Sequence, residues 1–156
     1  MKKLAIGIDP GKHGSIAVMD MAEHKIVDII KMPQTPADTL EVLGVYNPEQ
    51  CVAYLEQVNE QPRQSGMFEY GRNYGMIETA LAALKIPHYK CTPQKWQKGF
   101  QLRKPTTTDK AKAYRERKAI LKAKAQEIFP YLKKITLDTS DGLLLAEYAY
   151  QQEKTQ

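Results

Sequence analysis

Residues 4–20 read LAIGIDPGKHGSIAVMD, and this stretch decides the predicted fold. Bulky and small residues alternate over residues 4–9, so one face of the expected strand is bulky and the other tapers to small residues that end in Asp9. A Pro-Gly pair follows, and residues 15–19 return as a second strand, which predicts a hairpin. Asp9 is therefore expected at the open edge of a sheet, where it either binds a metal ion or simply forms the turn.

The composition predicts one globular domain over residues 1–156, because 156 residues with 42% hydrophobic content can bury a core without stabilising disulfides or metals. No apolar run approaches the roughly 18 residues that cross a bilayer, and the N-terminal run leads straight into Asp-Pro-Gly, unlike a signal peptide. We therefore expect a cytoplasmic protein with no membrane partner. Cys51 and Cys91 are isolated, which predicts neither a disulfide framework nor a zinc knuckle.

The net charge of +5 is distributed unevenly. Residues 90–134 contain 14 Lys and Arg against 3 acids, so the rest of the chain is net acidic. A basic segment beside an acidic site suits a polyanion with bound cations, because the basic side chains hold phosphates while the acids hold metal. An ordinary solvated helix face explains the charge equally well.

A second acid, Glu56, is predicted beside Asp9. Residues 25–31 form a third strand, Pro36 opens a helix, and residues 51–58 form a strand that is parallel to the first because a helix precedes it. The order β-β-β-α-β then brings the two strand ends together, although an acid at a strand end is common in itself.

The second half of the chain is predicted to be mainly helical, and Trp96 is expected to be a packing anchor. The expected elements are a helix from Gly75 to Lys85, a strand over residues 88–92, a helix beginning at Pro93, a long basic helix from Thr108 or Asp109 to about Phe129, and a last helix over residues 139–150 followed by a frayed tail.

A segment rich in glycine and aromatic residues, 61–75 (QPRQSGMFEYGRNYG), precedes the first of these helices. Its aromatic rings either stack on exposed bases or belong to the core at the start of the next helix. The candidates for DNA contact in it are Met67, Phe68, Tyr70 and Arg72.

Asp138 and Asp141 stand at the start of the last predicted helix. Their spacing of three places both carboxylates on one helix face, and a helix N-terminus stabilises their charge. The same spacing also imitates a capping box, so a purely structural role stays open at this point.

Taken together, these motifs resemble the RuvC-like Holliday junction resolvases of the RNase H-like superfamily. The resemblance rests on GIDPG at residues 7–11, YLEQV at 54–58 and DTSDG at 138–142, and covers essentially the whole chain. The middle, from GMFEYGRNYG to TPQKWQK, looks like the compact bacterial, phage and chloroplast branch. Some members have His where Asp138 stands, and many have Ala where Gly142 stands.

The resemblance implies an α/β, RNase H-like fold, with a mixed five-stranded sheet in which three antiparallel strands precede the parallel ones. It implies Asp9, Glu56, Asp138 and Asp141 as catalytic metal ligands for two Mg²⁺ ions per site, with Mn²⁺ as a substitute, because carboxylates suit these hard ions. Such a pair of ions, about 4 Å apart, promotes phosphodiester hydrolysis.

The partners implied are branched DNA, especially four-way junctions, and a second copy of the chain, because paired cuts need two sites. The helix after Gly75 is the expected dimer interface, and a bacterial or phage origin with a nucleoid-associated location is implied. The basic candidates for phosphate contact are Lys104, Lys110, Lys112, Arg115 and Lys118.

Three other functions compete with junction resolution. An RNase H-like nuclease of other specificity, cutting branched DNA or RNA–DNA hybrids, shares the four acids but does not need the aromatic segment. An actin-like ATP-binding domain fits GIDPGKHGS, but that architecture normally repeats its subdomain and needs a longer chain. A non-catalytic DNA-binding module is disfavoured because all four acids are present.

Overall fold

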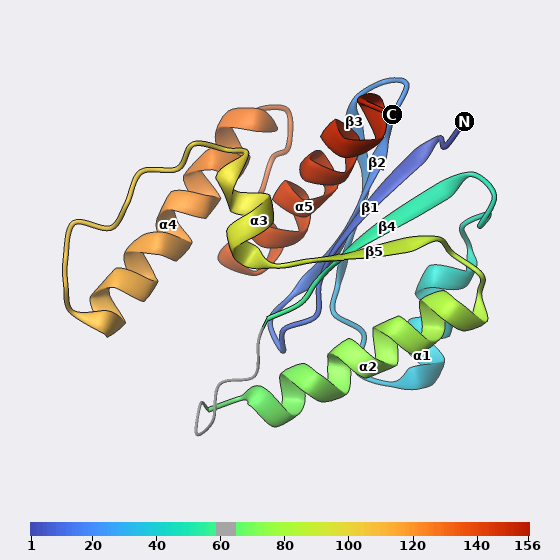
Figure 1. Ribbon diagram of the computed structural model, residues 1–156, viewed down its shortest axis with the longest axis horizontal. Helices are drawn as coiled ribbons and strands as arrows, with labels where there is room; N and C mark the ends of the chain where they lie inside the picture. The colour runs from blue at the N-terminus through green and yellow to red at the C-terminus, as the bar shows by residue number, and fades with distance from the viewer. Residues whose placement is uncertain (59–64) are drawn as a thin grey trace.

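The computed structural model describes residues 1–58 and 65–156, and its centre is a mixed five-stranded sheet (Figure 1). The strands lie in the order β3-β2-β1-β4-β5; β1, β2 and β3 pair antiparallel, whereas β4 runs parallel to both β1 and β5. The strands are β1 (Leu4–Asp9), β2 (Ser15–Asp20), β3 (Lys25–Lys31), β4 (Cys51–Glu56) and β5 (His88–Cys91). This arrangement confirms the predicted α/β, RNase H-like fold.

Helices cover both faces of the sheet (Figure 1). On one face, α1 (Pro36–Gly44) and α2 (Met67–Ala83) pack over the bulky side chains of β1 and β2. On the other face, α5 (Leu137–Lys154) lies along β1 and β2, while α3 (Pro93–Lys98) and α4 (Lys110–Ile128) pack beside it in the same core cluster. No helix in the described part of the chain is long and apolar enough to span a membrane.

The alternation in β1 has the consequence expected from the sequence. Ile6 and Ile8 are fully buried in the core beneath α1 and α2. Gly7 faces α5, and a β-carbon there would lie 2.6 Å from the carbonyl carbon of Leu145. A side chain at this position would push the helix off the sheet, so the small face of β1 allows α5 to approach the site closely.

Two strands end earlier than predicted. The strand expected over residues 51–58 stops at Glu56, and the strand expected over 88–92 stops at Cys91. These two residues form the last paired position between β4 and β5, and β1 has already ended at Asp9. The backbone N–H of Gln57 still donates to the Cys91 carbonyl at 2.9 Å, but neither β1 nor β5 continues beside β4 beyond this bond.

The helix boundaries also differ. The helix expected after Gly75 begins earlier, at Met67, with Gly71 and Gly75 inside it, because neither of these glycines adopts the positive φ that would end a helix. The predicted frayed tail is wrong as well. Gln151 donates a hydrogen bond to Glu147 one turn earlier, and α5 continues to Lys154. Residues 61–64, the start of the segment rich in glycine and aromatic residues, lie outside the described residues.

Candidate active site

Three carboxylates from three elements gather at one end of the sheet. Asp9 is the last residue of β1, Glu56 is the last residue of β4, and Asp141 lies near the start of α5. Ile8 pairs with Leu55 across the parallel strands, so the two acids that follow them are neighbours. All three acids are buried, with 8%, 6% and 5% of their surfaces exposed. Buried carboxylates need a partner, and three of them together are unusual in a purely structural role.

The turn after β1 holds Asp9 in place. The backbone N–H of Gly11 donates to Asp9 Oδ1 at 3.1 Å, and the N–H of Gly14 donates to the Gly11 carbonyl at 2.8 Å. A β-carbon on Gly14 would lie 2.8 Å from the Asp9 carbonyl carbon, so the tight turn requires glycine there. The Pro-Gly turn and the acid therefore form one unit, and the turn-former interpretation does not exclude a metal site.

The acids raise one another's affinity for protons. Burial, followed by repulsion from Asp141, raises the pKa of Asp9 to about 6. Burial, followed by repulsion from Asp9 and Asp141, raises the pKa of Glu56 to about 8. Carboxyl groups with raised pKa values in a shared site are typical of functional sites, because the protein holds charges together that nothing in its own fold fully neutralises.

Lys118 of α4 forms an ion pair with one of these acids, Asp141. Among the described residues, no other basic side chain forms an ion pair with Asp9, Glu56 or Asp141. Lys118 Nζ lies 2.7 Å from Asp141 Oδ2, and the lysine side chain is 27% exposed. Burial lowers the pKa of the ammonium, but Asp141 and Asp9 outweigh this effect and hold the pKa above its ordinary value. The other oxygen, Asp141 Oδ1, is buried without a hydrogen-bond partner in the described structure. That oxygen has an unused lone pair for a ligand.

Two aromatic residues hold Glu56 from opposite ends. The indole N–H of Trp96 donates to Glu56 Oε2 at 2.7 Å, and the hydroxyl of Tyr70 donates to the Glu56 backbone carbonyl at 2.9 Å. The sequence predicted Trp96 only as a packing anchor. A buried indole needs an acceptor, but its identity depends on a contact across 40 residues that no local pattern reveals.

Asp138 is placed differently from the other three acids. It lies in the first turn of α5 and is exposed, though close enough for its charge to act on Asp9. The capping-box interpretation of the two aspartates is wrong, because Thr136 and Thr139 form that box at the start of α5. Both aspartates are therefore free of capping roles.

The donor set fits a hard divalent cation. Asp9, Glu56 and Asp141 offer carboxylate oxygens, the preferred ligands of Mg²⁺ and Mn²⁺, and Asp141 Oδ1 is an orphaned buried acceptor. Among the described residues, however, no group of three or more Asp, Glu, His or Cys side chains is arranged to hold a metal ion in this conformation, and the ammonium of Lys118 occupies Asp141. A cation that binds here competes with Lys118 for Asp141.

The residues predicted to contact DNA form two groups, of which the first lies beside Glu56. Phe68 is 84% exposed, and it lines a pocket of about 390 Å³ next to Glu56 together with Met67 and Tyr70. Arg72 is exposed nearby, where its guanidinium donates to the Gln34 carbonyl at 3.4 Å. The second group contains the exposed basic residues Lys104, Lys110, Lys112 and Arg115, on α4 or in the loop before it.

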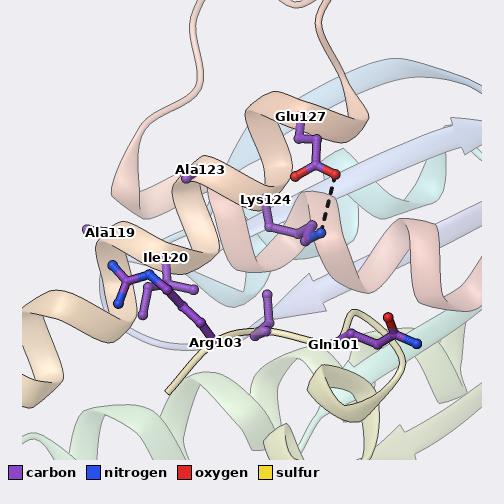
Figure 2. Close-up of a pocket in the computed structure, with 8 residues that line it drawn as sticks. Gln101, Arg103, Ala119, Ile120, Ala123, Lys124 and Glu127 are labelled. Atoms are coloured by element: carbon purple, nitrogen blue, oxygen red, sulfur yellow. Dashed lines mark hydrogen bonds and ion pairs between the residues drawn. The ribbon is translucent and has the colours of Figure 1, made fainter. Parts of the chain in front are cut away.

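A second hollow, which none of the candidate acids lines, is found between α4 and the loop that follows α3 (Figure 2). This groove of about 290 Å³ is lined by residues such as Arg103, Ile120 and Lys124. Its carboxylate, Glu127, pairs with Lys124 at 3.4 Å, while Arg103 pairs with Glu116 at 2.7 Å. Arg103, Lys124 and Glu127 each have an ion-pair partner, although Glu116, the partner of Arg103, does not line the groove.

Solved structures of other proteins match this fold. No model of a known protein family and no curated protein matches the sequence. Among solved structures, Thermus thermophilus RuvC in complex with a Holliday junction substrate matches with a TM-score of 0.66 at 17% identity, over 97% of this chain and 95% of that one. A second T. thermophilus RuvC structure matches with a TM-score of 0.64 at 18% identity, over 97% and 96%.

The chain therefore has an RNase H-like fold. More narrowly, its fold is that of RuvC along nearly the whole length of both chains, which confirms the predicted resemblance at the level of architecture.

Proposed function

We propose that this protein is a divalent-metal-dependent endonuclease that resolves four-way DNA junctions by paired phosphodiester hydrolysis. The observation that carries the proposal is the convergence of Asp9, Glu56 and Asp141, all buried, at the end of a RuvC-like sheet. RuvC binds a Holliday junction in one of the matching structures, and the basic α4 of this chain suits the same polyanion.

The roles of the residues follow from their positions. Asp9, held by the turn between β1 and β2, and Glu56, held by Trp96, bind the cation together with Asp141. When bound, the cation acts as a Lewis acid on the phosphodiester and lowers the pKa of a water nucleophile. Asp138 lies exposed at the rim, where it binds a second cation or orients water. Lys118 exchanges Asp141 for the phosphate once a cation has taken its place.

Resolution requires two cuts related by symmetry, so we propose a homodimer. Its interface is expected on α2, whose side chains beyond the core are largely exposed in the single chain. A monomer would nick a junction without resolving it.

The test is a cleavage assay with three labelled substrates in Mg²⁺: a four-way junction, a linear duplex of the same sequence, and an RNA–DNA hybrid. The proposal predicts paired cuts in the junction and little cutting of the other two. Asp9→Asn should abolish cleavage while leaving junction binding intact or tighter, because it removes a metal ligand and one charge that repels phosphate. Preferential cutting of the hybrid would replace junction resolution by RNase H-like activity, and near-normal cleavage by Asp9→Asn would overturn the site assignment.

A further inference from the structure

The two oxygens of the Glu56 carboxylate have different surroundings. Oε2 accepts the indole N–H of Trp96 at 2.7 Å, a short distance for such a bond. Oε1 makes no hydrogen bond with any residue that the structure describes, and it is not among the fully buried atoms that lack a partner. One oxygen is thus tied to the protein, and the other is available to a ligand.

The indole is itself held rigidly. Trp96 has no exposed surface and packs edge-to-face against Phe100, with ring centroids 6.1 Å apart. It therefore has little freedom to follow a carboxylate that moves, and instead determines where that carboxylate lies.

Few residues separate the strand position that pairs with Glu56 from Trp96, the hydrogen-bond donor. Glu56 pairs with Cys91 at the end of the parallel β4–β5 ladder, and α3 starts just two residues later. The Thr92 side chain caps α3 by accepting the N–H of Lys95, and Pro93 occupies its first turn. Trp96 consequently lies one turn into α3, on the side that faces the end of β4.

We propose that Trp96 is a positioning residue for the metal site: its indole N–H fixes the Glu56 carboxylate and reserves Oε1 for the cation. This inference rests on the proposed function, because it assumes that Glu56 binds a divalent ion. A carboxylate with one oxygen tied contributes a single oxygen to the ion, and groups that orient a metal ligand in this way typically change metal affinity by about 10- to 100-fold.

Trp96 is the single tryptophan of the chain, which makes the inference directly measurable. A cation on Oε1 draws electron density from the carboxylate and weakens the hydrogen bond at Oε2. The emission of Trp96 should therefore change when Mn²⁺ or Ca²⁺ is added without DNA, and Asp9→Asn should abolish this change.

The decisive variants remove the N–H but keep the ring. In Trp96→Phe an aromatic ring still fills the core, although the smaller ring leaves space. Because the chain has one tryptophan, biosynthetic replacement by its benzothiophene analogue, in which sulfur takes the place of the N–H, removes the donor with almost no change in shape. Phe100→Leu is the matched control, since it disturbs the packing of Trp96 without touching its hydrogen bond.

Calorimetric titration with Mn²⁺ in the absence of DNA, together with melting curves, tests the proposal. We expect the benzothiophene protein, and Trp96→Phe where it folds, to bind Mn²⁺ at least tenfold more weakly than the unmodified protein, while Phe100→Leu binds normally. The analogue is also expected to need more Mg²⁺ for half-maximal cleavage while its junction affinity is unchanged.

Equal Mn²⁺ affinity in the analogue and the unmodified protein overturns the inference. So does a loss of Mn²⁺ affinity in Phe100→Leu that is as large as the loss in the analogue. If Asp9→Asn binds Mn²⁺ as well as the unmodified protein does, the acids are not the metal site, and the proposed function fails together with the inference. If Asp9→Asn loses binding while the analogue keeps it, the proposed function stands and only the role of Trp96 is wrong.

Discussion

Lys118 Nζ and Asp141 Oδ2 form an ion pair of 2.7 Å at the centre of the candidate active site, where the lysine also acts on the charge of Asp9. The pair places a cation from α4 among three buried carboxylates. Lys118 therefore partly neutralises the acids, a role that the proposed divalent cation would take over.

This relationship predicts that Lys118→Met lowers the stability of the metal-free protein and that divalent cations restore that stability. Removing one partner of a buried ion pair leaves the other charge uncompensated and costs about 3–5 kcal/mol, somewhat less here because Lys118 is partly exposed. Melting curves in EDTA and in Ca²⁺ measure both effects. Lys124→Met is the matched control, because Lys124 lies on the same helix and its pair with Glu127 is 3.4 Å long and more exposed. Equal melting temperatures for the two variants in EDTA would contradict the prediction.

The raised pKa values predict an unusual pH dependence of stability. In the metal-free protein, Asp9 and Glu56 titrate near pH 6 and pH 8, above their ordinary values of 3.8 and 4.5. Between about pH 4 and pH 8 the folded state therefore binds more protons at these groups than the unfolded chain does. Their contribution to stability is complete below pH 4 and is lost as the pH rises, at about 1.4 kcal/mol per unit of pKa difference.

Glu56→Gln removes one of these groups while keeping an oxygen that can accept the indole N–H of Trp96. In urea titrations with EDTA, the variant should be more stable than the unmodified protein at pH 8, by on the order of a few kcal/mol. At pH 4 the difference should nearly vanish. A constant difference across this range would show that Glu56 is not strained by its neighbours.

The local patterns of the sequence predict the sheet and the positions of its acids well, for a physical reason. The alternation over residues 4–9 determines which face of β1 carries small side chains. The helix before β4 makes β4 parallel to β1, so Asp9 and Glu56, at the ends of these strands, meet at one end of the sheet. Local patterns do not predict the hydrogen bond from Trp96 to Glu56 or the ion pair of Lys118 with Asp141. Both contacts depend on how α3 and α4 dock against α5 and β4, and this is determined by packing between residues far apart in the chain.

The close packing of α5 on the sheet predicts that any side chain larger than hydrogen at Gly7 lowers the stability of the protein strongly. In Gly7→Ala the new methyl group meets the backbone of α5, with the Leu145 carbonyl carbon 2.6 Å away, so the helix carrying Asp141 must shift. We expect a loss of several kcal/mol or a failure to fold. Gly71→Ala is the control, because nothing lies near its β position and alanine favours a helix by about 1 kcal/mol. Chemical denaturation of both variants checks the contrast, and similar stabilities would refute it.

The exposed basic residues of α4 predict how DNA binding depends on salt. Lys110, Lys112 and Arg115 are all exposed, and neutralising them together should weaken binding to every branched substrate. The slope of log affinity against log salt should fall by roughly one unit per lost phosphate contact. The control is Lys3→Gln with Lys25→Gln, at the opposite end of the sheet from Asp9. An unchanged slope in the triple variant would mean that α4 is simply solvated.

The last prediction concerns what distinguishes a junction from a duplex, since any phosphodiester looks alike to a metal ion. Unstacked bases at a branch point offer flat faces, and stacking on an aromatic ring contributes about 1–3 kcal/mol per base. Phe68 is 84% exposed at the start of α2, so the core alternative, which predicts a stability loss of about 3 kcal/mol, does not apply to it. Tyr70 is different, because its hydroxyl donates to the Glu56 backbone at 2.9 Å.

Phe68→Ala should therefore reduce junction cleavage by about tenfold or more, since about 1.4 kcal/mol is a factor of ten, while the melting temperature and Mn²⁺ affinity stay unchanged. Tyr70→Phe is the matched control for the hydrogen bond, because it removes the hydroxyl and keeps the ring that could stack. Cleavage assays and melting curves on the same preparations decide between the two roles. Normal cleavage by Phe68→Ala, or a large drop in its melting temperature with normal activity of the folded fraction, would exclude stacking by Phe68 as the source of junction selectivity.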